Sequence, residues 1–237
     1  MRVLALDAST EACSVALLDG DRCIERVHES GKSHAQHILG MVGSVLAEAQ
    51  MSLSMLDGLA VSVGPGSFTG VRISVSVGQG LAFGAGLAVV PVTTLEALAF
   101  RAFTEGAPRA LACLDARMGE VYWGCFAADP ALGSRPIGPA GVGAPESVVL
   151  AHEDASLAYD YRGIGRGFAA YPQLSALTGA QLSPAASQAL PRACDMARLG
   201  ALRLAAGQGV DPAQLLPSYV RDKVALTEAE RRQAKPR

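Results

Sequence analysis

The sequence predicts an α/β protein made of two duplicated units with mixed sheets. The main observation is a repeated opening, in which an apolar strand, an aspartate, a short turn and a second apolar strand follow one another. This opening occurs at residues 3–19 and returns at residues 109–129, about a hundred residues later. Half of the residues are hydrophobic and 18% are charged, which is typical of a globular protein with a sizeable core.

The first unit is expected to begin with a three-stranded antiparallel meander. Two capping boxes, Ser33 with Gln36 and Thr93 with Glu96, predict where two helices begin. An apolar segment rich in Val, Ile and Gly is expected to be helical only if protein packs against both of its faces. The predicted elements are strands at 3–7, 14–19, 22–29, 59–63 and 88–92, and helices at 34–50, at 71–86 and from Thr93 through Phe103.

The second unit is expected to begin with the two strands of residues 109–129. The polar turn TEGAPR at 104–109 predicts the boundary, and the Gly- and Pro-rich residues 130–147 predict an irregular connection. A strand at 159–165 and helices around 193–206 would complete the unit. We therefore expect an N-terminal domain at 1–105, a C-terminal domain at 106–222 and a polar basic tail at 223–237.

Charge and hydropathy exclude some classes of function. The net charge is −2 and the pI is about 6.1, so the chain lacks the positive field that unaided tight RNA binding requires. Apolar stretches end before they reach the length of a membrane span, and the first strand is too short for a signal peptide. We expect a cytoplasmic protein without a membrane anchor. The basic residues Arg231, Arg232, Lys235 and Arg237 are expected to form a frayed tail.

The cysteines do not predict a disulfide framework or a metal site. There are five of them, an odd number, at positions 13, 23, 113, 125 and 194, and no two form a C-x-x-C pair. We expect reduced, buried thiols.

Four segments carry a resemblance to a known family. They are LALDASTEACSVAL at 4–17, GPGSFTGVRISVSVGQGLA at 64–82, DARMGEVYW at 115–123, and the pattern of Pro217, Tyr219 and Arg221. In this order, and spread over nearly the whole chain, they resemble the TsaB family, formerly called YeaZ. The resemblance implies an actin/hexokinase-like (ribonuclease H-like) fold of two paired domains.

The resemblance also implies a role and partners. TsaB proteins are non-catalytic scaffolds that pair with the paralogue TsaD, which transfers threonylcarbamoyl to adenosine 37 of tRNA. TsaE, a small ATPase, joins the pair. By this resemblance, tRNA would reach the chain only through the complex. Without TsaD, two copies could use the same surface and form a homodimer.

Some residues are candidates for contact with a nucleotide. In relatives that use ATP, the first aspartate loop and the glycine turns contact metal and phosphate, since a carboxylate holds hydrated Mg²⁺ and a glycine turn exposes backbone N–H donors. The same positions could instead only terminate a strand and satisfy turn amides. No phosphate-binding lysine follows GPGSFTG, so we expect no cofactor, except for ATP or ADP at the interface with TsaD. The candidates are Asp7, Ser9, Thr10, Gly64, Gly66, Asp115 and Arg117.

His34 and His37 could share a metal ion from one helix face, but the sequence assigns no third ligand. TsaD binds metal with histidines spaced i, i+4, whereas HAQH has the spacing i, i+3. We therefore expect no metal site. A protease is also disfavoured, because neither G-x-S-x-G nor H-E-x-x-H occurs. Trp123 and Tyr122 are expected in the core.

The predicted partner surface lies on the helices at 34–50 and 71–86, whose apolar stripes are wider than a small monomer needs. Its expected members are Ile38, Leu39, Val42, Val45, Leu46, Phe68 and Arg72. Two rival functions remain open. One is an independent ATPase or kinase of the same fold, and the other is a plain RNA-binding protein, which the acidic balance disfavours.

Overall fold

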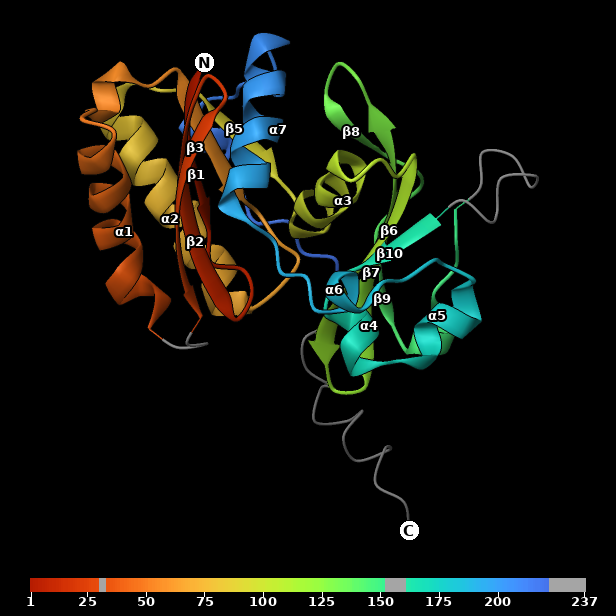
Figure 1. Cartoon of the computed structure of the whole chain (residues 1–237). Helices are drawn as coiled ribbons and strands as arrows, with labels where there is room; N and C mark the ends of the chain where they lie inside the picture. Colours follow the sequence, from red (N-terminus) through yellow and green to blue (C-terminus); the bar gives the residue numbers. More distant parts are fainter. Residues whose placement is uncertain (30–32, 152–160, 222–237) are drawn as a thin grey trace.

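The computed structural model describes residues 1–29, 33–151 and 161–221, and it forms two lobes that are each built on a mixed sheet (Figure 1). The first sheet has the strand order β3-β2-β1-β4-β5, with β1, β2 and β3 antiparallel and β1, β4 and β5 parallel. The predicted meander is therefore confirmed. The strands are β1 (Arg2–Asp7), β2 (Ala12–Asp19), β3 (Arg22–Glu29), β4 (Gly58–Ser62) and β5 (Val89–Val92).

Helices cover both faces of the first sheet, which explains why β1 is apolar at successive positions. Leu4 and Leu6 face helices α1 (His34–Glu48) and α2 (Phe68–Ala85), whereas Val3 and Ala5 face helix α7 (Ala193–Ala205) on the other side. Successive side chains of a strand point to opposite faces, so a sheet buried twice needs an apolar residue at each position. The first lobe comprises these five strands with α1, α2 and α7.

The position of α7 corrects the expectation that helices around 193–206 complete the second unit. The helix packs on β1, β2 and β4 of the first sheet, and Met196, Ala197 and Leu199 are buried there. It approaches closely, because a Cβ on Gly200 would lie 2.6 Å from the Cβ of Ala60. The chain therefore returns from the second lobe to finish the first.

The second sheet has the strand order β10-β6-β7-β8, with β9 paired to β7. The predicted pair at 109–129 is confirmed as β6 (Arg109–Arg117) and β7 (Glu120–Asp129), and the strand predicted at 159–165 corresponds to β10 (Tyr161–Ile164). Residues 130–147, expected to be irregular, contain β8 (Gly133–Pro136) and β9 (Gly141–Gly143), which is a correction. Helices α4 (Gly167–Ala170), α5 (Gln173–Thr178) and α6 (Pro184–Ser187) belong to this second lobe. Helix α3 (Thr94–Thr104), expected in the first unit, packs on the second sheet as well, which is a further correction. Short 3-10 helices occur at Leu53–Met55, Pro145–Ser147 and Pro212–Gln214.

Among the described residues, only one face of helix α2 is covered, so the packing expected on its other face stays a prediction. Val71, Val75 and Gly78 are buried, and a Cβ on Gly78 would lie 2.6 Å from Val61 Cγ2. The opposite face, which includes Phe68 and Arg72, is exposed. The glycine at 78 therefore serves close packing on the sheet, and the helix depends on that packing for stability.

The cysteine prediction was wrong for two of the five residues. Cys23 and Cys194 form a disulfide, whereas Cys13, Cys113 and Cys125 are free and buried as expected. Over the described ranges, no helix has both the length and the hydropathy needed to cross a bilayer. The predicted tail at 223–237, with its four basic residues, lies outside the described residues.

Candidate functional site in the cleft between the lobes

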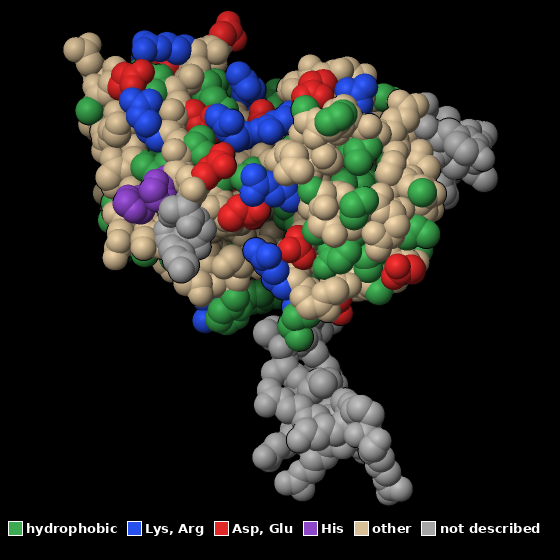
Figure 2. Space-filling model, turned by 60° about the horizontal axis from the view of Figure 1, so that its bottom comes forward, with side chains coloured by type: hydrophobic (Ala, Val, Ile, Leu, Met, Phe, Trp, Pro, Cys, Tyr) green, Lys and Arg blue, Asp and Glu red, His purple; other side chains and the backbone are tan. Residues whose placement is uncertain are grey.

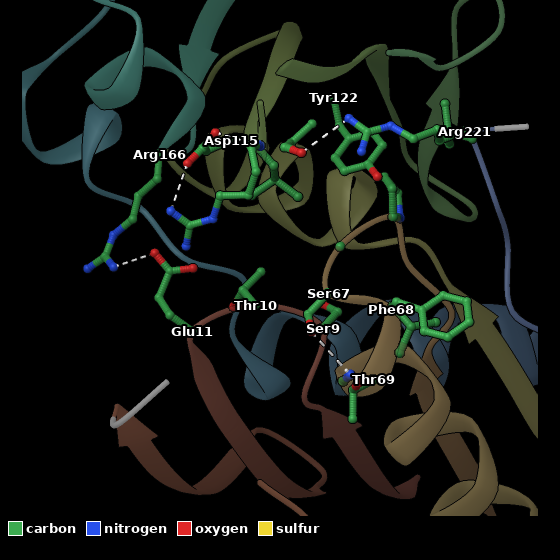
Figure 3. A pocket seen from close by; sticks show the side chains of 18 of the residues that line it. Ser9, Thr10, Glu11, Ser67, Phe68, Thr69, Asp115, Tyr122, Arg166 and Arg221 are labelled. Carbon is green, nitrogen blue, oxygen red and sulfur yellow. Dashed lines mark hydrogen bonds and ion pairs between the residues drawn. The ribbon is translucent and has the colours of Figure 1, made fainter. Parts of the chain in front are cut away.

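A cleft of about 770 Å³ lies between the two lobes. Side chains from both lobes point into it (Figure 3). The first lobe contributes the loop after β1 and the N-terminal end of α2, and the second lobe contributes the β6–β7 hairpin and α4. The segment 218–221, which follows the last 3-10 helix, forms a further wall. The lining includes Ser9, Thr10, Glu11, His34, Gly66, Ser67, Phe68, Thr69, Asp115, Arg117, Tyr122, Arg166, Tyr219 and Arg221.

The two loops of the first lobe touch each other backbone to backbone. Ser67 N donates to Ser9 O at 2.7 Å. A Cβ on Gly66 would lie 2.1 Å from Ser9 O, and one on Gly70 would lie 1.9 Å from Ala8 O, so only glycine fits at either position. The glycines of GPGSFTG are therefore used within the chain, and its own backbone fills the space between the loops.

Asp7 ends β1 beneath this contact and is fully buried. Its Oδ1 accepts hydrogen bonds from Ser9 N at 2.9 Å and Ser9 Oγ at 2.6 Å, and Ser9 Oγ also accepts one from Thr94 at 2.9 Å. Within the described residues, Oδ2 has no hydrogen-bond partner of ordinary geometry. Burial raises the pKa of Asp7, more than the hydrogen bonds from Ser9 lower it.

Acidic and basic side chains of the cleft neutralise one another (Figure 2). Arg166 Nη1 binds Glu11 Oε1 across the cleft at 2.6 Å, and Arg117 Nη1 lies 3.2 Å from Asp115 Oδ2 in the hairpin. Burial raises the pKa of Glu11, but the hydrogen bond from Arg166 and the nearby guanidinium charges bring it below its ordinary value. An anion entering the cleft would have to compete with these carboxylates.

Segment 216–221 connects the two lobes beside the cleft. Ser218 N donates to Val63 O at 2.7 Å in the first lobe, and Arg221 binds Glu120 and donates to Ala116 O in the second. Arg221 also lies over the ring of Tyr122, so this tyrosine lines the cleft in addition to packing in the core, where it was expected. The Pro217, Tyr219 and Arg221 pattern therefore acts as a strap.

Comparisons with known proteins decide the family. A model of the family "TsaD: tRNA N6-adenosine threonylcarbamoyltransferase" matches residues 28–227. The tRNA threonylcarbamoyladenosine biosynthesis protein TsaB of Escherichia coli is 39% identical over 95% of this chain and 96% of its own length. The chain belongs to the TsaB family. The TsaB of Haemophilus influenzae is 36% identical over 94% of this chain and 95% of its own length.

Solved structures agree with this TsaB assignment. YeaZ from Pseudomonas aeruginosa is 42% identical, with a TM-score of 0.81 over 92% of this chain and 99% of its own. A crystal structure of a protein similar to peptidase YeaZ, from the same species, is 41% identical, with a TM-score of 0.82 over 93% and 99% of the two chains. Together with the TsaD-type family match, they confirm the predicted actin/hexokinase-like fold.

In this TsaB-family chain, the candidate nucleotide residues separate into two groups. Ser9, Thr10, Gly66, Asp115 and Arg117 all line the cleft. Asp7 and Gly64 lie behind it: Asp7 is fully buried, and Gly64 has a φ of 97° with its Cβ position 3.1 Å from Val71. Glu11 and Arg166 were not among the predicted site residues, although Glu11 lies inside the first family motif.

The predicted partner stripe needs a correction. Ile38, Val42 and Val45 are almost fully buried against the first sheet, so they belong to the core and not to a surface. Leu46 is partly buried against the same core, whereas Leu39 is 57% exposed and Phe68 is 50% exposed. A helix on a sheet points one stripe inward, and that stripe contains the most apolar residues of α1.

The two histidines of α1 face different neighbours. His34 Nε2 lies 2.9 Å from Thr10 O inside the cleft wall, whereas the ring of His37 contacts that of His28 on β3, with the centroids 4.1 Å apart. In the part of the chain that the structure describes, no three His, Cys, Asp or Glu side chains gather in an arrangement that could hold a metal ion.

Proposed function

We propose that this chain is a subunit of the machinery that makes threonylcarbamoyladenosine in tRNA, and that it acts there as the non-catalytic partner of a TsaD-type chain. The observation that carries the proposal is the outer face of α1 and α2. These helices lie side by side on the first sheet (Figure 1) and present a surface that no other described part of the chain covers.

The outer face of α1 and α2 has the composition of an interface. Arg72 is the only ionisable residue of α2, and Leu39 and Phe83 are 57% and 80% exposed. Depletion of charge and exposed large apolar side chains mark surfaces that bind protein.

Four glycines of this face have no role in packing against the other described residues. A Cβ on Gly40, Gly43, Gly80 or Gly84 would meet nothing within 4 Å. Glycine inside a helix costs about 1 kcal/mol relative to alanine, so each of these positions is a loss to the isolated monomer. A second helix that packs directly on the bare backbone would offset the loss.

The cleft supports a non-catalytic role. Gly66 and Gly70 pack against the carbonyl oxygens of Ser9 and Ala8, and the carboxylates of Glu11 and Asp115 already pair with guanidiniums. The isolated chain would therefore hold no cofactor, and ATP or ADP would bind only where a TsaD-type chain completes a site. Under this proposal, a TsaE-type ATPase joins the pair in the cytoplasm. Under the same proposal, tRNA is bound through the complex, and a homodimer forms on the same face when the partner is absent.

Charge placed on the outer face should separate association from folding. We expect Leu39→Glu and Phe83→Glu to melt within a few degrees of the wild type, since both side chains are exposed. Binding of the TsaD-type chain should weaken at least about 100-fold, because the new carboxylate would be buried without a partner. Titration calorimetry and tRNA modification in a reconstituted assay measure this.

The control is Val42→Glu on the inner stripe of α1, which should unfold the protein because Val42 is 4% exposed. If Leu39→Glu and Phe83→Glu both bind the partner normally, α1 and α2 do not form the interface. If these variants lose a homodimer but still bind the TsaD-type chain, the outer face of α1 and α2 serves self-association only.

ATP turnover tests the rival function. We expect the isolated chain to show no Mg²⁺-dependent ATP hydrolysis above the level of an Arg117→Ala, Arg166→Ala control, which removes two cationic side chains of the cleft. Turnover that this double variant abolishes would instead indicate an independent ATPase.

A further inference from the structure

The disulfide joins an edge strand of the first sheet to the helix that returns from the second lobe. Cys23 lies on β3, and Cys194 lies in the first turn of α7, with their Cα atoms 6.2 Å apart and their positions 171 apart in sequence. Side chains alternate along β3, so Cys23 and Glu25 face α7, whereas Arg26 and His28 contact α1. The bond therefore fixes the point at which the chain re-enters the first lobe.

Exposure distinguishes this pair from the other three cysteines. Cys23 and Cys194 are partly exposed, whereas Cys13 and Cys113 are 0% exposed and Cys125 is 4% exposed. Burial also raises the pKa of each of these three thiols, to about 12 for Cys13, so they are poor nucleophiles near neutral pH. A small thiol in solution can reach only the pair.

The junction has a second set of contacts that does not depend on the sulfur atoms. Glu25 Oε2 accepts hydrogen bonds from Arg192, one of them at 3.0 Å from Nε, and Glu25 Oε1 accepts one from Cys194 N at 3.1 Å. Ala193 N donates to Ser14 Oγ at 3.1 Å in the buried interior. These bonds can hold α7 on the sheet when the disulfide is open, so both redox states can be folded.

The junction is also connected to the cleft. Arg166, which binds Glu11 across the cleft, donates to Gln188 O in the segment that leads into α7. The disulfide restrains the far end of that segment at Cys194. Opening it would remove the covalent restraint at that end and leave α7 held by its apolar packing and by these polar contacts.

We propose that Cys23 and Cys194 form a reversible dithiol–disulfide site that responds to the small-molecule thiol couple of its compartment. In the oxidising direction, one protein thiolate attacks a glutathione-class disulfide and displaces a thiolate. The second protein thiolate then attacks the mixed disulfide and displaces another. The protein loses two electrons and two protons, and the small disulfide becomes two thiols. In compartments that keep thiols reduced, such disulfides are mostly redox-sensing or catalytic.

The test uses the full chain in buffers with graded ratios of reduced to oxidised glutathione. Free thiols are trapped with iodoacetamide without denaturant and assigned by peptide mass spectrometry, and melting is followed in parallel. We expect Cys23 and Cys194 to become alkylated together as the ratio rises, and the melting temperature to fall by at least about 5 °C. Both changes should reverse when oxidised glutathione is restored.

Two kinds of variant make the result specific. Cys23→Ser and, independently, Cys194→Ser should melt at one temperature in every buffer, close to that of the reduced wild type. Cys125→Ala should keep the full redox response. The proposal is overturned if the pair stays oxidised at every ratio until the protein unfolds, if it never forms, or if Cys23→Ser still responds. None of these results would affect the proposed role of α1 and α2.

Discussion

At the scale of single residues, Gly66 and Gly70 show how a motif found in the sequence can be used for contacts inside the chain. GPGSFTG was recognisable from its letters, and a role in binding an anion was one of its predicted uses. The structure instead places both glycines against the loop at residues 8–9, more than fifty positions away in sequence. The carbonyl oxygens of Ala8 and Ser9 occupy the positions that a Cβ on Gly70 or Gly66 would need. No pattern within the motif could reveal that neighbour, because the contact exists only in the folded chain.

Replacement of Gly70 should therefore be far more harmful than replacement of Gly80 in the same helix. We expect Gly70→Ala to lower the free energy of unfolding by about 3 kcal/mol, because the new methyl group would meet the Ala8 carbonyl at 1.9 Å. Gly80→Ala meets no atom and should raise it by up to about 1 kcal/mol. Urea unfolding followed by Trp123 fluorescence measures both. Equal stability of the two variants would mean that the loops are not in contact.

At the scale of elements, hydrophobic periodicity located most helices and strands, and capping signals were less reliable. Thr93 Oγ1 accepts a hydrogen bond from Glu96 N at 3.2 Å, so the cap of α3 is present. The Glu96 carboxylate does not close the box, because Arg203 and Ser134 bind it instead. Ser33 makes no side-chain cap at all and has a φ of 66°. Such competition between partners depends on tertiary contacts that a local motif does not contain.

The two caps give a matched pair of substitutions. We expect Thr93→Ala to cost about 1 kcal/mol of stability, since the N–H of Glu96 would lose its partner inside the protein. Ser33→Ala should change stability by less than about 0.5 kcal/mol, because the side chain makes no cap hydrogen bond. Thermal or urea denaturation distinguishes them. A large effect at Ser33 would show that its hydroxyl caps α1 in solution after all.

Element orientation was the larger gap in the sequence analysis. The apolar stripe of α1 was visible, but its direction was not, since a stripe can face a sheet or a partner with the same spacing. Ile38 and Val42 proved to face the sheet, and Leu39 proved to face outward. The short strands β8 and β9 were missed because glycine and proline are frequent there, and only pairing with β7 makes those residues extended.

At the scale of the whole molecule, the duplicated opening predicted two sheets, and the structure contains two. The charges that join the lobes could not be predicted in the same way. Glu11 and Arg166 are 155 positions apart, and each could have remained an ordinary solvated side chain. The packing of α7 on the first sheet could not be predicted either, because its apolar stripe could cover either sheet. In both cases, the Glu11–Arg166 pair and the packing of α7 on the first sheet, the contact joins segments that are distant in sequence.

Because α7 comes late in the chain, the first lobe can be completed only late in synthesis. Helix α7 packs on one face of the first sheet, at Val3, Ala5, Ala60 and Val90. That face therefore remains exposed to solvent until residue 205 has left the ribosome. At roughly 5–20 residues per second, the nascent first lobe spends on the order of ten seconds with that face uncovered. During this interval it is a natural client for chaperones. A stalled or prematurely terminated chain would carry the same sticky face permanently.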